Sequence, residues 1–496
     1  MVDPTPEQAE AIATYGDGLD MVMQAGAGCG KSSTLKLIAK SDPRRRMLYV
    51  AYNRSIAADA ARSMPGNVVA KTGHGLAFNP RHLPRLKQPR QTAHAAAEAL
   101  GVKRILGILG TAPAIPTDRG ATLAMLPRII MRVALETVTR WCYSADREIR
   151  ARHVPEYRGL TSPVAREQLL ALVLPVALAA WADLTDPAGV LRMQHDHYLK
   201  MWALSGPTLA ADTVLLDEAQ DTNDVLSHAL MGQEHAQRIA VGDSAQQIYA
   251  WRGARDALGR FRDGLGAPEL TLSQSFRFGP AIADTANVWL ALIDAPLRLR
   301  GWDGAESTVG SVEDPDAVLC RTNAGAIAVV LDALAAGRRV ALVGGGDDAK
   351  RLAWAAEALM QGRQTDHPEL MAFTSWSQVR EYAEDEDGSL RTLVRLIDAH
   401  GPQSIAAAAD QLAPEETADL VVSTVHKAKG REWDTVTIHG DFLPPKPDRI
   451  GRTVLPREEG RLAYVAVTRA RRRLDDHALA WVHSLTESAP AEEAAA

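Results

Sequence analysis

Short apolar runs alternate along the chain with longer segments whose apolar residues recur at helical spacing. In the first half of the chain the runs cover residues 19–23, 47–51, 68–70, 213–216 and 238–241. Each run is too short for an independent helix and is followed by Gly or polar residues, as in the buried strands of a parallel sheet. Because residues 33–40 and similar segments between the runs have helical periodicity, the pattern predicts an α/β fold.

A second set of apolar runs predicts a second sheet. We expect this sheet to begin at residues 269–272 and to continue at 317–320, 340–343, 420–422 and 435–438. The last expected element is a helix over residues 458–470, with Leu462, Val465 and Val467 facing the sheet.

Two mostly helical segments interrupt the strands. From about residue 81 to 207 the strand pattern vanishes, and Ala-rich amphipathic helices such as 91–100 and 121–140 replace it. The basic run 81–87 fits either a solvated face or a contact with nucleic acid. The predicted domains are a first lobe (1–80 and 208–265), a helical insertion (81–207), a second lobe (266–345 and 418–487), a reduced helical insertion (346–417) and a disordered tail (488–496).

Composition limits the function only loosely. The chain has 496 residues, 46% of them hydrophobic and 23% charged, which is ordinary for a globular protein of several domains. The net charge of −6 neither favours nor excludes nucleic acid, because a basic channel can lie within an acidic total. The three cysteines are far apart, so their spacing predicts neither a disulfide framework nor a zinc or iron–sulfur site. The start shows no signal segment and the apolar run 171–182 is too short to span a bilayer, so we expect a cytoplasmic protein without membrane contact.

Residues 24–32, with the sequence QAGAGCGKS, have the character of a phosphate-binding loop. The loop lies between an apolar strand and a helix, where Gly-rich backbone amides and the helix N-terminus can hold phosphate oxygens. Lys31 would reach the β- and γ-phosphates, and the Ser32 hydroxyl would bind Mg²⁺. Ala25 stands where the strict pattern has Gly, so a plain Gly-rich turn is the competing interpretation.

Polar residues also follow other predicted strands, where ligands bind in open parallel sheets. Asp217 and Glu218 come directly after the run 213–216. Asp217 is placed to hold Mg²⁺, and Glu218 to polarise an attacking water. Gln246 lies after the run 238–241 and could sense a γ-phosphate. A charged loop after a strand is the alternative, and it accounts poorly for these carboxylates because the phosphate loop needs such a partner.

Aromatic and amide side chains suggest contacts with bases. Tyr249 and Trp251 offer flat faces on which bases could stack. The segments 52–53 and 72–74 end two further strands, and a structural turn explains either of them equally well. Gln8 follows a helix start at Thr5 and could contact an adenine edge or simply cap the helix.

In order along the chain, these motifs resemble those of the UvrD/Rep-like helicases of superfamily 1. A glutamine motif, the phosphate loop and T-x-x-H are followed by D-E-x-Q-D, G-D-x-x-Q-x-I-Y-x-W-R-G-A, Q-S-F-R, T-x-H-x-A-K-G-x-E and Y-V-A-V-T-R-A. The resemblance runs from residue 5 to about residue 475. Segments 203–205 and 373–376 are similar to the F-box DNA helicase branch.

The resemblance implies two RecA-like, parallel-sheet P-loop NTPase lobes with helical insertions, and ATP and Mg²⁺ between the lobes. It assigns catalysis to Lys31, Asp217, Glu218, Gln246, Arg277 and Arg469, and the metal to Ser32 and Asp217. It assigns ATP contacts to Gln8, Ala25, Gly26, Ala27, Gly28, Cys29, Gly30, Lys31, Ser32, Ser33, Arg252, Phe276, Arg277, Glu432 and Arg469. It assigns contacts with DNA to Tyr52, Asn53, Thr72, His74, Tyr249, Trp251, Arg321, Thr424 and His426.

The chain departs from the family pattern in places. Ser33 stands where relatives often carry an Arg that sandwiches the base, and Gly460 replaces the first of two arginines in the last motif. The segment between Arg321 and Thr424 is short, so we expect the second accessory domain to be reduced. No nuclease-like cluster of carboxylates and lysine follows Ala470.

The function implied by the resemblance is ATP-driven translocation along single-stranded DNA with unwinding of tailed duplexes. A 3′-to-5′ polarity comes from the family alone. One alternative is a translocase that strips proteins from DNA and unwinds little, which the short second insertion favours. Another is an ATP-gated DNA-binding switch, which the complete set of catalytic residues disfavours. A protein partner that loads the enzyme on DNA is left open.

Overall fold

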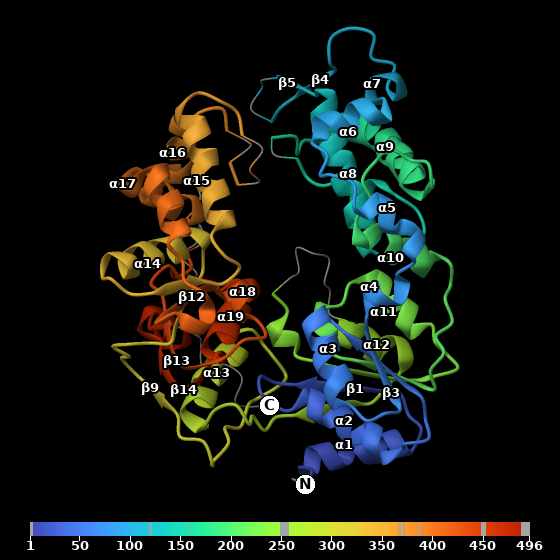
Figure 1. Cartoon of the computed structure of the whole chain (residues 1–496), viewed down its shortest axis with the longest axis vertical. Helices are drawn as coiled ribbons and strands as arrows, with labels where there is room; N and C mark the ends of the chain where they lie inside the picture. Colours follow the sequence, from blue (N-terminus) through green and yellow to red (C-terminus); the bar gives the residue numbers. More distant parts are fainter. Residues whose placement is uncertain are drawn as a thin grey trace. The chain divides into compact units, whose positions relative to one another are not determined.

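A computed structural model describes residues 3–118, 120, 122–157, 159–248, 257–365, 367, 369–370, 373–385, 388–447 and 453–487. The chain forms two compact units. The first comprises Met1–Gln24 and Lys31–Leu272, and the second comprises Ala25–Gly30 and Ser273–Ala496. Figure 1 labels most of the helices and several strands of both units.

The first unit contains a six-stranded sheet in the order β3-β2-β6-β7-β1-β8. Its strands are β1 (Met21–Ala25), β2 (Met47–Ala51), β3 (Val68–Thr72), β6 (Thr213–Leu216), β7 (Gln237–Gly242) and β8 (Glu269–Leu272). The central pairs are parallel, with Met23 opposite Val241 and Leu48 opposite Val214. Every residue of β1, β2 and β6 is buried, which is why these strands are continuous apolar runs in the sequence.

Helices connect the strands of this sheet. They are α1 (Pro6–Gly16), α2 (Lys31–Ser41), α3 (Arg54–Ser63), α4 (Gly73–Ala77), α10 (His195–Leu204), α11 (Asp224–Met231) and α12 (Ala257–Leu265), with short 3₁₀ turns at Pro80–His82, Ala219–Asp221 and Ser244–Gln246. Helix α1 begins at Pro6 as predicted, because Thr5 and Gln8 form a reciprocal capping box.

The helical insertion of the first unit has its own core. Its helices are α5 (Leu83–Leu86), α6 (Ala93–Leu100), α7 (Val102–Ile105), α8 (Pro127–Tyr143) and α9 (Pro163–Thr185), with a 3₁₀ turn at Ala151–His153. Met131, Trp141 and Val173 are among the side chains buried between these helices. The expectation that this segment lacks strands was wrong, because β4 (Ala114–Pro116) and β5 (Thr122–Ala124) form a short antiparallel pair.

The apolar run 171–182 is the middle of the 23-residue helix α9. By length and composition alone, α9 is long and apolar enough to cross a membrane, with a mean hydropathy of 1.7, and a third (33%) of its apolar stretch is buried inside the structure. Leu169, Val176 and Leu184 lie on its buried side, and Leu178 is exposed.

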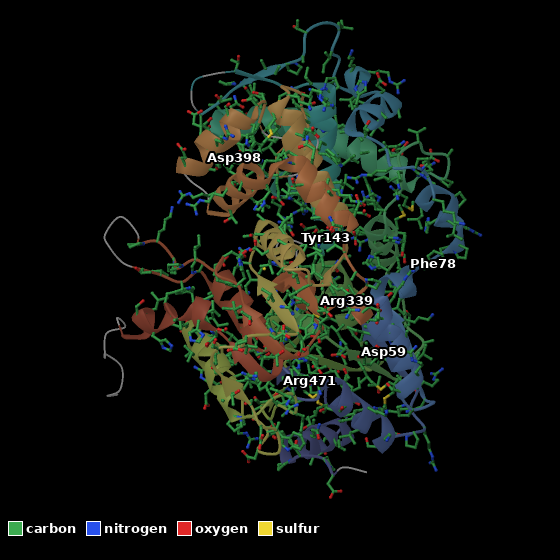
Figure 2. All side chains as sticks on the ribbon, turned by 60° about the vertical axis from the view of Figure 1, so that its left-hand side comes forward. Asp59, Phe78, Tyr143, Arg339, Asp398 and Arg471 are labelled. Atoms are coloured by element: carbon green, nitrogen blue, oxygen red, sulfur yellow. The ribbon has the colours of Figure 1, made fainter. Side chains whose placement is uncertain are left out.

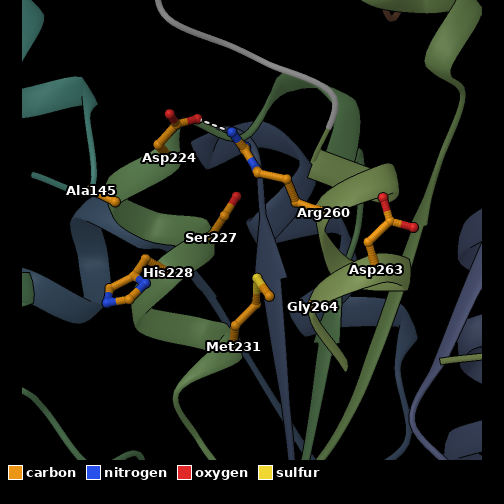
Figure 3. A pocket seen from close by; sticks show the side chains of 8 residues that line it. All are labelled: Ala145, Asp224, Ser227, His228, Met231, Arg260, Asp263 and Gly264. Atoms are coloured by element: carbon orange, nitrogen blue, oxygen red, sulfur yellow. Dashed lines mark hydrogen bonds and ion pairs between the residues drawn. The ribbon is translucent and has the colours of Figure 1, made fainter. Parts of the chain in front are cut away.

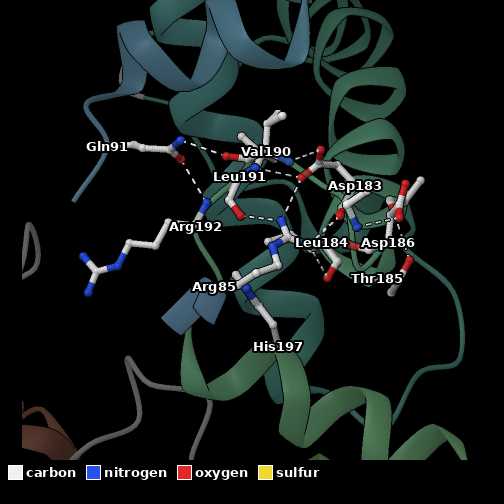
Figure 4. Close-up of polar contacts among 12 residues, drawn as sticks. Arg85, Gln91, Asp183, Leu184, Thr185, Asp186, Val190, Leu191, Arg192 and His197 are labelled. Atoms are coloured by element: carbon white, nitrogen blue, oxygen red, sulfur yellow. Dashed lines mark hydrogen bonds and ion pairs between the residues drawn. The ribbon is translucent and has the colours of Figure 1, made fainter. Parts of the chain in front are cut away.

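A buried arginine closes the C-terminal end of α9 (Figure 4). The Arg85 guanidinium donates to the carbonyl oxygens of Asp183 at 2.8 Å and of Asp186 at 2.6 Å, and also to that of Leu191. It also forms an ion pair with the Asp183 carboxylate at 3.0 Å. The Asp183 carbonyl belongs to the last turn of α9, where a helix end leaves carbonyls short of intrahelical donors, whereas Leu191 lies beyond the helix. Arg85 is therefore committed to the protein itself, although it belongs to the basic run 81–87.

We expect Arg85→Met to destabilise the insertion by about 3–5 kcal/mol, because the Asp183 carboxylate and several carbonyls would lose a buried cation. Urea unfolding followed by circular dichroism measures the change. Arg81→Met is the matched control, because Arg81 is exposed, and it should change stability by less than about 0.5 kcal/mol. Equal stabilities of the two variants would contradict the structural role of Arg85.

The second unit contains a parallel sheet in the order β11-β12-β10-β13-β14-β9. Its strands are β9 (Thr308–Val309), β10 (Ala317–Cys320), β11 (Val340–Leu342), β12 (Leu420–Thr424), β13 (Trp433–Ile438) and β14 (Ala470–Asp475). Two sequence predictions were wrong here. Residues 269–272 were expected to begin this sheet but form the edge of the first one. The helix expected over 458–470 is present at Arg457–Val467, but it is not the last element, because β14 follows it. The predicted α/β class with two parallel sheets is confirmed.

The helices of the second unit fall into two groups. One group borders the sheet: α13 (Pro280–Leu292), α14 (Asn323–Ala335), α18 (Val425–Ala428), α19 (Arg457–Val467) and α20 (Val482–Glu487), with 3₁₀ turns at Glu415–Thr417 and His477–Leu479. The other group is α15 (Asp347–Met360), α16 (Trp376–Asp385) and α17 (Gly388–Asp410). Leu352, Trp376 and Leu393 share the core of this second group. Asp398, labelled in Figure 2, accepts hydrogen bonds from Trp376 at 2.9 Å and Arg380 at 2.8 Å and so joins α17 to α16.

Candidate nucleotide and nucleic-acid site

Two glycines of the predicted phosphate loop adopt backbone conformations that other residues rarely adopt. Gly28 and Gly30 adopt left-handed φ angles of 75° and 72°, and α2 begins at Lys31. Within the second unit, the Phe276 amide donates to the Gly28 carbonyl at 2.9 Å, and the Ala27 amide donates to the Tyr464 hydroxyl at 3.2 Å. A Cβ at Gly28 would lie 2.6 Å from Ser275 Oγ, so only glycine fits there.

The structure brings Ser32, in the first turn of α2, together with Asp217, which follows β6. Ser32 Oγ donates to Asp217 Oδ2 at 2.9 Å, and the Tyr49 hydroxyl donates to the same oxygen. Asp217 is 2% exposed, and this burial, reinforced by the neighbouring Glu218 charge, raises the pKa of its carboxyl group. Burial and the Asp217 charge likewise raise the pKa of Tyr49. The hydrogen bonds from Tyr49 and Ser32 and the Lys31 charge favour the ionised carboxylate, but burial and the Glu218 charge outweigh them.

Asp217→Asn should stabilise the nucleotide-free protein by about 1–3 kcal/mol near neutral pH, because burying the ionised carboxylate is costly. The pKa of Asp217 is raised on folding. Asp217 therefore contributes most to the stability of the folded state below the pKa that its carboxyl group has in the unfolded chain. This contribution is lost as the pH rises through the pKa of Asp217 in the folded state. The stability gap between variant and parent should widen between pH 4 and neutrality.

Urea unfolding without Mg²⁺ at several pH values measures this gap. Asp212→Asn is the control, and its effect should have the opposite sign. The hydrogen bond from Arg46 lowers the pKa of Asp212, so removing the Asp212 charge should reduce stability. An Asp217→Asn variant that is less stable than the parent at neutral pH would contradict the expectation.

A chain of hydrogen bonds links Glu218 to the end of β7. Glu218 has a left-handed φ of 50°, which is uncommon for a residue other than glycine and often marks a functional position. Its Oε2 accepts from Gln220 at 2.6 Å, and Gln220 Oε1 accepts from the Asp243 amide at 2.9 Å. Asp243 Oδ2 accepts from Gln246 at 2.8 Å. Gln220 and Asp243 belong to the sequence motifs, but the motifs alone did not indicate this connecting role.

Gln8 is a capping residue that also faces α2. Its side-chain oxygen accepts from the Thr5 amide at 3.1 Å, and its amide nitrogen donates to Thr34 Oγ1 at 3.1 Å. Gln8 therefore caps α1, and its side chain is buried, with 7% of its surface exposed. Ser33 on the same helix α2 is exposed.

In the second unit, Arg277 meets Glu432 and the end of α19. Arg277 Nε donates to Glu432 Oε2 at 2.6 Å, and its terminal nitrogen donates to the Thr468 carbonyl at 2.9 Å. Two residues predicted to contact ATP therefore lie together. Phe276 is 43% exposed, so its ring is accessible for stacking.

Arg469 has a different environment. It is 1% exposed and donates to the Val465 carbonyl at 2.9 Å, the Arg431 carbonyl at 3.2 Å and Thr468 Oγ1 at 3.2 Å. Its guanidinium thus braces the C-terminal end of α19 in this structure. The sequence motif gave no sign of this burial.

The predicted DNA-contacting residues of the first unit divide into caps and exposed side chains. Asn53 caps α3 through the Ile56 amide at 2.9 Å, and Thr72 caps α4 through the Gly75 amide at 3.0 Å. His74 Nε2 lies 3.0 Å from Asp196 Oδ1, and Tyr52 is 36% exposed. Asn53 and Thr72 therefore cap helices, and Tyr52 presents a ring.

In the second unit, Arg321 forms a two-pronged ion pair with Glu459, at 2.6 and 2.8 Å. Thr424 is buried, and His426 is partly buried in α18. The predictions for Tyr249, Trp251 and Arg252 concern positions outside the described residues.

A hollow of about 360 Å³ lies beside α11 and α12 (Figure 3). Asp224 and Arg260 form an ion pair at its edge, and Ser227 and Met231 line its wall. None of its lining residues belongs to the predicted nucleotide or DNA sets.

Comparison with known families and proteins agrees with this architecture. Residues 8–252 match the AAA domain, and residues 350–475 match the UvrD-like helicase C-terminal domain. The chain is 28% identical to F-box DNA helicase protein 1 of Schizosaccharomyces pombe over 91% of its own length and 55% of that protein. The chain is also 28% identical to F-box DNA helicase 1 of Gallus gallus, over 91% of its own length and 46% of that protein.

DNA helicase II of Escherichia coli is 32% identical over 29% of this chain and 20% of that protein. The chain spans about half the length of the F-box DNA helicases that it matches. The chain therefore contains an AAA domain followed by a UvrD-like helicase C-terminal domain and is homologous to the F-box DNA helicases.

Proposed function

We propose that this chain is an ATP-driven motor that moves along single-stranded DNA and unwinds tailed duplexes. The observation that carries the proposal is the hydrogen-bonded pair of Ser32 and Asp217, 2.9 Å apart, with Glu218 adjacent to it. The named DNA helicases among its homologues support DNA as the substrate. Residues 81–207 and 346–417 would be the helical insertions of the two lobes.

The residues present fit ATP and Mg²⁺. A hydroxyl and a carboxylate are the hard oxygen donors that Mg²⁺ prefers, and the buried Asp217 needs a nearby cation when ionised. Mg²⁺, when bound, would neutralise charge on the β- and γ-phosphates. Gly28 and Gly30 leave room for phosphate oxygens, and Lys31 opens α2, whose N-terminus favours anions.

The chemistry that we assign to the protein is the positioning of water and the stabilisation of charge. Glu218 would accept a proton from the attacking water, and the hydrogen bond from Gln220 would orient its carboxylate. Arg277 would place a planar guanidinium at the γ-phosphate, with Glu432 holding its Nε. Phe276 would stack on adenine. Gln246, linked to Glu218 through Asp243 and Gln220, would transmit the state of the phosphate to the DNA-binding residues.

We further propose that the DNA path includes Tyr52 and His74 in the first lobe and Arg321, Thr424 and His426 in the second. Stacking on an aromatic side chain is worth about 1–3 kcal/mol per base and does not depend on sequence. Motion would run 3′ to 5′, as expected from the family resemblance.

Phosphate release with and without a single-stranded oligonucleotide tests the proposal. We expect strong stimulation by the oligonucleotide and faster strand separation for a duplex with a 3′ tail than with a 5′ tail. Strand separation only from the 5′ tail would overturn the polarity. Displacement of a bound protein without strand separation would favour the stripping translocase. Tight DNA binding without stimulated turnover would favour the ATP-gated switch.

A further inference from the structure

Three side chains with metal-binding atoms converge at one edge of the second sheet. Cys320 ends β10, and His439 and Asp441 follow β13, which is the parallel neighbour of β10. Because parallel strands end at the same edge, residues far apart in sequence meet there. Cys320 Sγ, His439 Nδ1 and an Asp441 carboxylate oxygen lie within 4.8 Å of one another. None of these residues has a role in the proposed ATP or DNA sites.

The histidine and the carboxylate approach each other without a well-aligned hydrogen bond. His439 Nδ1 lies 3.1 Å from Asp441 Oδ1, yet this nitrogen is shielded from solvent and has no hydrogen-bond partner. Two ligands on a tetrahedral zinc ion, with bonds of about 2.0–2.2 Å, lie about 3.3–3.6 Å apart, slightly more than the separation of these two atoms. The spacing therefore fits a nitrogen and an oxygen that point toward a shared ion.

The Asp441 carboxylate keeps capacity for an ion. Oδ2 accepts from the Thr322 amide and hydroxyl, both at 2.8 Å, and Oδ1 accepts from the Arg321 amide at 2.8 Å. A carboxylate oxygen has two lone pairs, so Oδ1 retains one. These amide contacts also fix the orientation of the carboxylate, as outer hydrogen bonds do for metal ligands.

Space and charge also favour a cation. A Cβ at Gly325 would lie 2.1 Å from Asp441 Oδ2 and 3.2 Å from His439 Nδ1, so this glycine keeps the carboxylate and the imidazole accessible to each other. Cys320 is fully buried. A bound divalent ion would stabilise the thiolate and offset the burial of the Asp441 carboxylate.

We propose that Cys320 Sγ, His439 Nδ1 and Asp441 Oδ1 bind one divalent transition-metal ion, with zinc the best match to this donor set. A nitrogen, a sulfur and an oxygen ligand suit zinc, and the fourth tetrahedral position is left for water. The ion joins the ends of β10 and β13 to the start of α14, where Arg321 and Thr322 lie. It therefore stiffens the backbone that carries Arg321. The sequence did not predict this site, because the three cysteines are widely spaced and Cys320 is far from His439 and Asp441 along the chain.

Cobalt(II) is a direct probe of the site. Protein stripped with a chelator and titrated with Co²⁺ should take up one equivalent and develop the tetrahedral d–d bands together with a thiolate-to-cobalt charge-transfer band. Added Zn²⁺ should remove both signals. Cys320→Ser should lose the charge-transfer band, whereas Cys142→Ser, which changes a buried cysteine of the first unit, should keep it.

His439→Gln guards against a trivial loss through misfolding, because the His439 side chain is 31% exposed. Without metal it should melt like the parent protein, and it should bind Co²⁺ at least about tenfold more weakly. Zn²⁺ should raise the melting temperature of the parent but not of Cys320→Ser. The absence of a thiolate band in the parent protein, or an equal band in Cys320→Ser, would overturn the proposal.

Discussion

Glu218→Gln is expected to lower DNA-stimulated ATP hydrolysis by about 10²–10⁴-fold while nucleotide binding stays intact. Glutamine has nearly the same shape, so it can keep the left-handed backbone at this position and the contact with Gln220. What it lacks is a group that can accept a proton from water. Steady-state phosphate release, together with binding of a fluorescent ATP analogue, separates loss of turnover from loss of binding.

Glu234→Gln is the matched control for this experiment. Glu234 is an exposed carboxylate of the same unit with no assigned role, and the same change there should leave turnover unaltered. Equal rates for Glu218→Gln and the parent protein would remove Glu218 from the catalytic set. Equal losses of binding and turnover would show that its role is structural.

Arg277→Ala should reduce turnover by about 10³–10⁵-fold, the range associated with an arginine that stabilises transferring phosphate. Arg277→Lys should recover little of this loss. Arg277 donates simultaneously to Glu432 and to the Thr468 carbonyl, and a planar guanidinium can do this while presenting further donors. The lysine ammonium keeps the charge but not that fork.

Single-turnover hydrolysis with saturating ATP measures the Arg277 effect. Arg298→Lys is a control, because Arg298 donates to nearby carbonyls, such as that of Ala295 at 2.7 Å, and has no assigned role in the site. Arg469→Lys is expected to lower thermal stability as well as rate, since Arg469 is buried against the α19 backbone. Normal turnover by Arg277→Lys would exclude the proposed role of the guanidinium fork.

The fold could be predicted best where strands are buried on both faces. The runs 47–51, 213–216 and 317–320 match β2, β6 and β10 at both ends, because full burial demands continuous apolar sequence. Strand β14 was missed because, after Ala470, three exposed arginines precede the buried Leu474. Strand β8 was recognised but given to the wrong sheet, because an apolar run does not indicate which neighbours it will pair with.

The candidate site shows the same division. A phosphate loop and a strand-end aspartate predicted that Ser32 and Asp217 would meet, and they do. Tyr49, which donates to Asp217, was hidden inside an apolar run, where a tyrosine reads as another core residue. Motif letters identified Arg469 but could not show that its guanidinium is engaged by backbone carbonyls, because that depends on packing around α19.

The contacts of Arg85 have a consequence for how the helical insertion could have been acquired. Arg85 lies near the start of the insertion, and the carbonyls of Asp183 and Leu191 that it binds lie toward the end, so a single side chain holds the two connections close together. A segment whose ends are already adjacent can be lengthened or exchanged with little entropic cost to the sheet that carries it. Chimeras that keep Arg85 and its partners Asp183 and Leu191 should therefore tolerate replacement of the part of the insertion that lies between Arg85 and Asp183 in the sequence.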